Sequence, residues 1–189
     1  MQRREELEAI LRANASLMRV MEIARGLEMP DWLVVSGAVY QSVWNHVTGR
    51  AADYGVKDYD LVYFDPDTSW DAEDVFIKRA ALAYPPPLDA LVEVRNQARV
   101  HLWFEGKFGE PYAPLHSSAE ALERFVCPAF SIGARLEADG ALTIEAPFGL
   151  DDLFAMRLRP NPTRGLAKGW DRVTASARAR WPEVEIVGP

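Results

Sequence analysis

The order of the predicted helices and strands limits the folds open to this chain more than any other feature of its sequence. Apolar residues recur near the helical period through residues 2–28, with Asn14 and Ser16 placed to divide the segment into two helices. Apolar runs of strand length follow at residues 32–35, 58–64 and 91–95, and helical segments separate them only irregularly. Mixed elements without strict strand–helix alternation are typical of an α+β fold.

The remaining segments complete this prediction. Asp139-Gly140 lies between residues 130–137 and 141–146 and predicts a β-hairpin. Further helices are expected at residues 38–46, 71–83, 97–108, 117–125, 150–154 and 164–181. We expect a mixed sheet flanked by helices, with an N-terminal helical segment and a C-terminal hairpin-plus-helix extension. The 189 residues are expected to form one domain, with its core at about 30–110 and the extension at about 111–189.

Composition excludes several classes of protein. Hydrophobic residues make up 49% of the chain and charged residues 26%, which is not the balance of a disordered chain. The single cysteine excludes a disulfide framework and a cysteine-based zinc site. The first ten residues are charged throughout, unlike a secretory signal, and the longest uncharged run, residues 32–49, holds too many polar residues to span a membrane. We therefore expect a soluble, cytoplasmic protein with no membrane partner.

Charge is distributed unevenly along the sequence. The net charge is -7, so the surface as a whole should repel a nucleic-acid backbone, and nucleic acid is an unlikely partner. Residues 157–180 nevertheless contain seven basic residues against Asp171 alone. A local anion site near the C-terminus therefore remains open.

The most informative motif is Asp58-Tyr59-Asp60 at the start of a predicted strand. Side chains two positions apart on a strand point to the same face, so both carboxylates project together. Two adjacent carboxylates repel each other unless a cation or solvent lies between them. Mg²⁺ commonly takes one or two protein carboxylates together with substrate phosphates. The alternative is a solvated strand start, and the motif alone favours that alternative.

Two further features favour a binding site. Ser36-Gly37 lies between a buried-looking strand and a helix start, where backbone N–H groups attract phosphate, although a simple helix cap has the same pattern. Glu93 lies in the middle of an apolar strand, where a carboxylate is unfavourable unless it is paired or binds a cation. An ion pair with Arg95 or Arg99 is the structural alternative for Glu93.

Taken together, these segments resemble a bacterial nucleotidyltransferase-like family of poorly characterised proteins, within the superfamily typified by DNA polymerase beta. The likeness lies in SGAVYQSVWN at 36–45, KDYDLVYFD at 57–65 and EVRNQARVH at 93–101. FGLDDLF at 148–154 and RPNP at 159–162 extend it, so it covers most of the chain.

The resemblance implies a fold, a reaction and a set of site residues. Asp58, Asp60 and Glu93 would be catalytic and would hold Mg²⁺ (or Mn²⁺), and Ser36-Gly37 would bind phosphate. The implied reaction transfers a nucleoside monophosphate from a nucleoside triphosphate to an acceptor, which we expect to be a small molecule or a protein side chain. The alternatives are a non-catalytic nucleotide-binding or regulatory module with the same fold, and a phosphoesterase that uses the same carboxylates.

Two basic and polar groups are candidates for positioning a substrate. Arg95, Gln97 and Arg99 directly follow Glu93, and a polar network that supports the Glu93 strand is an equal alternative. Lys168 and Arg172, spaced by four with Arg164 on the predicted last helix, form a basic stripe that would border the cleft. A solvated helix face is the alternative for that stripe.

Overall fold

The computed structural model describes residues 2–188, and its N-terminal segment is divided as the sequence predicts. Helix α1 (Gln2–Ala13) and helix α2 (Ala15–Gly26) meet at Asn14, whose side chain accepts a hydrogen bond of 3.0 Å from the Leu17 N–H. This is the usual role of asparagine at a helix N-cap. The helices bury one apolar face each against the rest of the protein, through Leu7, Leu11, Leu17 and Met21.

Five strands form one mixed sheet. They are β1 (Leu33–Val35), β2 (Tyr59–Tyr63), β3 (Val92–Asn96), β4 (Gly133–Leu136) and β5 (Leu142–Glu145), in the spatial order β3-β2-β1-β4-β5. Strands β2 and β3 run parallel, and the other three pairings are antiparallel. The expected α+β class is confirmed. The hairpin β4–β5, which we had placed in a C-terminal extension, instead pairs with β1 and completes the central sheet.

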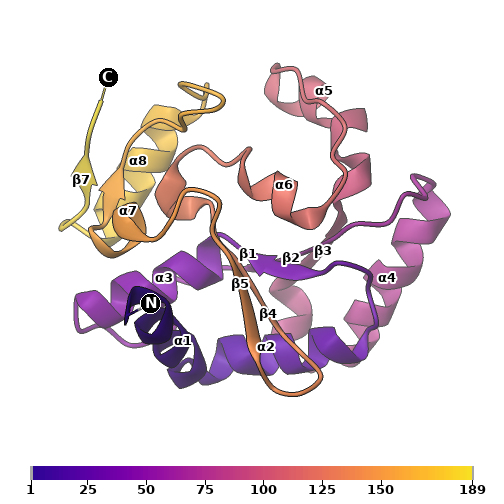
Figure 1. Ribbon diagram of the computed structural model, residues 1–189. Coiled ribbons are helices and arrows are strands. Elements are labelled where there is room, and N and C mark those ends of the chain that lie inside the picture. The colour runs from indigo at the N-terminus through magenta and orange to yellow at the C-terminus, as the bar shows by residue number, and fades with distance from the viewer. Residues whose placement is uncertain (1, 189) are drawn as a thin grey trace.

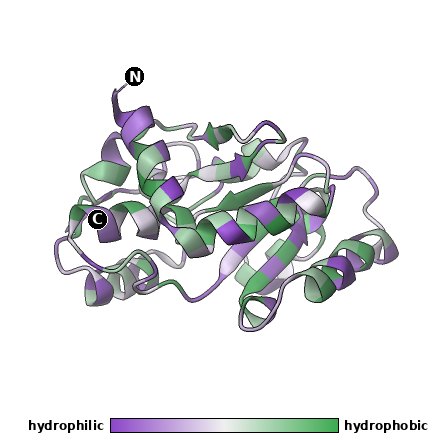
Figure 2. Ribbon diagram, turned by 90° about the horizontal axis from the view of Figure 1, so that it is seen from below, coloured by the Kyte–Doolittle hydropathy of each residue, from purple (hydrophilic) through white to green (hydrophobic). Residues whose placement is uncertain are grey.

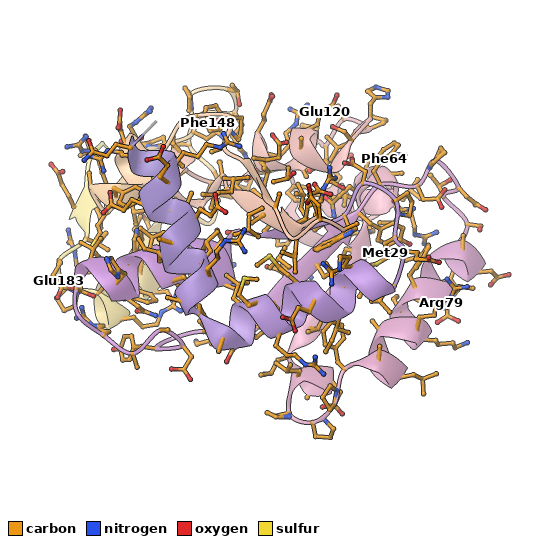
Figure 3. The ribbon with its side chains drawn as sticks, turned by 60° about the horizontal axis from the view of Figure 1, so that its bottom comes forward. Met29, Phe64, Arg79, Glu120, Phe148 and Glu183 are labelled. Carbon is orange, nitrogen blue, oxygen red and sulfur yellow. The ribbon has the colours of Figure 1, made fainter. Side chains whose placement is uncertain are left out.

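Helices surround this sheet. They are α3 (Gly37–Val47), α4 (Trp70–Ala83), α5 (Phe104–Phe108), α6 (Ser118–Leu122), α7 (Asp151–Phe154) and α8 (Trp170–Arg180). Single 3₁₀ turns lie at Leu88–Ala90 and Pro128–Phe130, and β6 (Arg157–Leu158) pairs parallel with β7 (Glu185–Ile186). Figure 1 shows α2 below the sheet and α6 above it. Helices α4 and α8 lie at opposite ends of the molecule, as do Arg79 on α4 and Glu183 beyond α8 in Figure 3.

Three predicted helices are shorter than expected, and of the one expected at residues 117–125 only α6 (Ser118–Leu122) forms. Residues 97–108 form a 3₁₀ segment (Gln97–Leu102) followed by the short α5, because Trp103, with φ -129° and ψ -15°, interrupts the helical backbone. The last helix begins at Trp170 rather than at residue 164. Asn161 holds the preceding residues as a loop by donating to the Glu123 and Phe125 carbonyls, and Gly165 has a φ of +71° that a helix excludes. Arg164 and Lys168 therefore lie in a loop, and the predicted helical stripe that joins them to Arg172 does not exist.

The two faces of the sheet are covered differently. Tyr59, Leu61 and Tyr63 of β2 point into the main hydrophobic core, which includes the apolar residues of α1, α2 and α3. Leu33, Val35 and Val62 point to the opposite face and form a smaller cluster with Leu122 of α6. The helical ribbons in Figure 2 change between hydrophilic and hydrophobic colours along their length, as helices with one buried side do. No helix among residues 2–188 has both the length and the apolar character needed to cross a bilayer.

Candidate functional site

The sheet topology places Ser36-Gly37 beside the Asp58-Tyr59-Asp60 motif. Strand β1 ends one residue before Ser36, and the antiparallel β2 begins one residue after Asp58. In this register Val35 faces Asp60 directly. A β-carbon built on Gly37 would lie 3.9 Å from Asp58 Oδ1. Two sequence segments about 20 residues apart thus form one wall of a site.

A pocket of about 470 Å³ opens at this wall. Ser36, Gly37, Asp58 and Asp60 all line it. The opposite side comes from α8 and the segment between α6 and the hairpin, and its lining residues are Phe125, Val126, Phe130, Arg172, Val173, Ser176 and Arg180. The pocket is within the size range of ligand sites in proteins.

The electrostatics of the pocket centre on Asp60. Burial and, to a smaller extent, the negative charges of Asp58 and Glu93 raise the pKa of Asp60, whereas Arg95 lowers it, and the net pKa is about 6. The carboxylate therefore carries a charge that its protein surroundings oppose, as expected for a group that awaits a cation. No three His, Cys, Asp or Glu side chains within residues 2–188 are grouped closely enough to hold a metal ion on their own. Two carboxylates still match the donor set of Mg²⁺ that is completed by substrate phosphates.

The wall that contains the carboxylates also includes the N-terminus of α3. The N-cap Ser36 has φ 53° and ψ -108°, an unusual conformation for a residue with a side chain. Its N–H donates to the Ile132 carbonyl at 2.8 Å, and its own carbonyl accepts from the Val39 and Tyr40 amides. The amides of Gly37 and Ala38 begin the helix, so no preceding turn supplies them with a carbonyl. The helix dipole and these N–H groups favour an anion at this place.

Gln41 adds a polar group that sequence reasoning missed. It lies one helical turn after Gly37, is 5% exposed and lines the pocket. Its Nε2 donates to the Tyr40 hydroxyl at 3.2 Å, whereas its buried Oε1 has no hydrogen-bond partner within the described part of the chain. A buried polar atom without a partner is unfavourable, so a bound ligand or water is expected to satisfy it. A glutamine among the apolar residues of a predicted helix was the available sequence signal.

Three basic residues line the pocket, two of them on α8 and one beside Asp58. Lys57, Arg172 and Arg180 line it, and only Arg172 was proposed from sequence. Arg180 is held in place because its Nη1 donates to the Gly55 carbonyl at 2.9 Å and its guanidinium lies 4.8 Å from the centre of the Trp181 ring. Lys57 directly precedes Asp58, but nothing in the sequence connects Arg180 to a motif more than a hundred residues earlier.

An aromatic cluster docks α8 onto α3 and so fixes the basic side of the pocket. Tyr40 stacks on Phe130 with ring centroids 4.2 Å apart, and Trp44 and Trp181 meet edge to face at 5.4 Å. The Trp181 Nε1 also donates to Asn45 Oδ1 at 3.0 Å. The four aromatic side chains are buried and form part of the main hydrophobic core.

Glu93 lies beside the site rather than in the pocket. It pairs in register with Asp60 on the parallel β3 strand, so both side chains are on the same face of the sheet. Its side chain is 60% exposed, does not line the pocket, and forms an ion pair of 3.5 Å with Arg95. The structure thus contains the ion pair that the sequence offered as an alternative. The charge of Glu93 nevertheless acts on Asp60.

The other proposed positioning residues are distributed over different places. Arg99 Nε is 2.8 Å from Glu73 Oε2 in a largely buried ion pair with α4, and the Arg99 guanidinium also bonds the Thr68 carbonyl. This placement gives Arg99 a structural partner away from the pocket. Gln97 and Lys168 line a second, adjacent pocket, and Arg172 lines both.

Two comparisons with known proteins found a match. A family model described as nucleotidyltransferase matches residues 22–186. A solved structure described as "The NMR structure of the protein reveals a CCA-adding enzyme head domain" aligns with a TM-score of 0.78 at 21% identity, over 98% of this chain and 96% of that chain. At this identity the likeness shows a shared fold. A sequence search of curated proteins found no match.

Proposed function

This chain belongs to the nucleotidyltransferase family, and from that premise we propose that it transfers a nucleoside monophosphate from a nucleoside triphosphate to a small-molecule or protein acceptor with the help of a divalent metal. One observation carries the proposal. The pocket brings two carboxylates, Asp58 and Asp60, together with the N-terminus of a helix and three basic side chains. Such a site suits a ligand that consists of phosphates and a cation.

The phosphates are proposed to bind at the start of α3. Gly37 leaves its backbone accessible, because a β-carbon there would extend toward Gln41 and Asp58 at 3.5 and 3.9 Å, into space that a phosphate can use. The first amides of the helix would donate to phosphate oxygens. Lys57, Arg172 and Arg180 would offset the negative charge of the triphosphate in a protein whose net charge is -7.

Asp58 and Asp60 are proposed to hold Mg²⁺ or Mn²⁺. The residues fit such an ion, since Asp58 and Asp60 both line the pocket with carboxylate oxygens and the Asp60 charge is opposed, on balance, by its protein surroundings. When bound, the ion would neutralise charge that develops on the phosphates during transfer.

The proposed reaction is a substitution at the α-phosphorus of the nucleotide. The acceptor oxygen forms a bond to the α-phosphorus, the bond from that phosphorus to the bridging oxygen breaks, and pyrophosphate leaves with the bond electrons. The acceptor proton passes to a carboxylate oxygen, for which Asp60 is better placed than Glu93 because it lines the pocket. Glu93 would support the site through its charge on Asp60 and is the third acidic residue of the proposal.

A second candidate function has one observation in its favour. Glu93 is exposed and paired with Arg95, so two carboxylates rather than three line the pocket. A nucleotide-binding or regulatory module without catalysis would need no more than these two. Transfer activity separates the candidates, because the non-catalytic module would bind nucleotide without any transfer. If the wild type transfers, Glu93→Gln should reduce transfer while nucleotide binding persists.

The test of the proposed function measures binding and product release together. Calorimetric titration with ATP, CTP, GTP and UTP in Mg²⁺ should show binding by the wild type and its loss in Asp58→Asn and Asp60→Asn. Asp71→Asn, at an exposed position on α4, removes the same charge elsewhere and should bind as the wild type does. Release of pyrophosphate on adding an acceptor identifies transfer, and release of inorganic phosphate identifies a phosphoesterase. Unchanged Mg²⁺–nucleotide affinity in both site variants would refute the proposal.

A further inference from the structure

A second pocket of about 260 Å³ adjoins the one that contains Asp58 and Asp60. Its walls are largely apolar and aromatic, with Phe104, Phe108 and Tyr112 on one side and Phe125 and Val126 on another. The rings of Phe104 and Tyr112 are 4.4 Å apart between centroids, so the aromatic wall is continuous. Its volume is below that of a typical pocket for a drug-sized ligand, which suits a body of one or two rings.

Positive charge is concentrated at the rim of this pocket. Arg124, Arg164, Lys168 and Arg172 line it, against one acid, Glu110. The Glu110 carboxylate already has partners, because it forms an ion pair with Arg164 and accepts a hydrogen bond of 2.8 Å from the Lys168 backbone N–H. Within residues 2–188 neither Arg124 nor Arg172 has a carboxylate within ion-pair distance. A pocket lined by basic side chains and by apolar and aromatic side chains is complementary to a ligand that combines an anionic group with an apolar portion.

The second pocket is continuous with the first. Phe125, Val126, Arg172 and Val173 line both. A molecule in the second pocket would therefore lie next to a nucleotide whose phosphates occupy the first.

We propose that the second pocket binds the acceptor, and that the acceptor is a small molecule with a flat aromatic or apolar body and one carboxylate or phosphate group. This inference rests on the proposed function for its acceptor role. A nucleobase is the other flat group near the site, but it is neutral at pH 7 and gives no reason for the unpaired Arg124, which lines the second pocket and not the first. The charge of the rim thus favours the acceptor over the base.

The experiment uses two aromatic probes that share a naphthalene body, one with an anionic and one with a neutral substituent. The probes are 2-naphthoate and the neutral 2-naphthamide, titrated into the wild type with and without Mg²⁺–ATP and followed by ligand-observed NMR. We expect 2-naphthoate to bind together with Mg²⁺–ATP, and 2-naphthamide to bind about tenfold more weakly because it lacks the charge-assisted contact. Arg124→Gln should reduce 2-naphthoate binding to the level of 2-naphthamide, and Phe108→Ser should weaken both probes.

Control variants and nucleosides make the outcome decisive. Arg178→Gln removes an exposed charge from α8 outside both pockets and should leave 2-naphthoate binding unchanged. Equal binding of the two probes, or displacement of 2-naphthoate by free nucleosides, would overturn the inference, the second result because the pocket would then bind the base. Binding of Mg²⁺–ATP without any binding of 2-naphthoate would remove this inference alone. Binding of 2-naphthoate without any Mg²⁺–nucleotide binding would remove the proposed function and the acceptor role with it.

Discussion

Replacing Asp60 with asparagine should stabilise this protein, although it should abolish nucleotide binding. Burial, together with the charges of Asp58 and Glu93, raises the pKa of Asp60 from 3.8 to about 6. A carboxyl group whose pKa is higher in the folded state binds its proton more tightly when folded. Stability therefore falls as the pH rises from about 4 to about 6, and the full loss is present above that range. Asp60→Asn keeps the shape of the side chain and removes the charge that causes the loss.

The magnitude follows from the difference between the two pKa values. A difference of about 2 pKa units at about 1.4 kcal/mol each gives at most about 3 kcal/mol of stability gained at pH 8. For a chain of this size, 1 kcal/mol corresponds to a melting-temperature shift of about 2–4 °C, so the upper limit is about 6–12 °C. At pH 4, where Asp60 is protonated in the folded protein, the variant and the wild type should be nearly equal.

Urea denaturation at pH 8 and at pH 4, with a chelator present, measures this difference. Glu6→Gln is the control, because Glu6 is exposed on α1 and does not line the pocket, and it should change stability little at either pH. Adding Mg²⁺ at pH 8 should stabilise the wild type and not Asp60→Asn. A variant that is no more stable at pH 8, or equally more stable at both pH values, would refute the reasoning that an uncompensated charge at Asp60 lowers stability.

Three further predictions concern the backbone at Ser36-Gly37 and the ion pair between Arg99 and Glu73. Gly37→Val should weaken triphosphate binding in calorimetry while the melting temperature changes little. Gly37→Ala should bind triphosphate better than Gly37→Val, because a β-carbon at this position makes only ordinary contacts. Equal affinity of the wild type and both variants would leave Gly37 as a plain helix start. Ser36→Gly should raise the free energy of unfolding by about 1 kcal/mol, since glycine adopts the observed φ of 53° without strain, and a loss of stability in urea denaturation would contradict this. Arg99→Met should lower the free energy of unfolding by about 3–5 kcal/mol in urea denaturation, because it leaves the Glu73 carboxylate buried without its cationic partner. A decrease below about 1 kcal/mol would exclude a structural role for that ion pair.

Much of the fold was predictable because it depends on local patterns. The division of the N-terminal helices at Asn14, the hairpin turn at Asp139-Gly140 and the apolar runs of β1, β2 and β3 are each specified by neighbouring residues. The prediction was wrong where a distant contact overrode the local pattern. Residues 164–169 have helical spacing, but Asn161 binds the carbonyls of Glu123 and Phe125 and holds the loop away from α8.

The candidate site divides in the same way. The sequence by itself determined that Asp58 and Asp60 share one face of a strand and that Ser36-Gly37 starts a helix, because both features follow from the chemistry of consecutive residues. Only the tertiary structure decided that these two segments face each other, since that depends on the antiparallel register in which Val35 meets Asp60. It also decided that Arg180 reaches the pocket, that Arg99 is engaged by Glu73, and that Glu93 lies outside. The packing of α8 on α3 and the pairing of side chains across the sheet are long-range contacts, and no spacing along the chain records them.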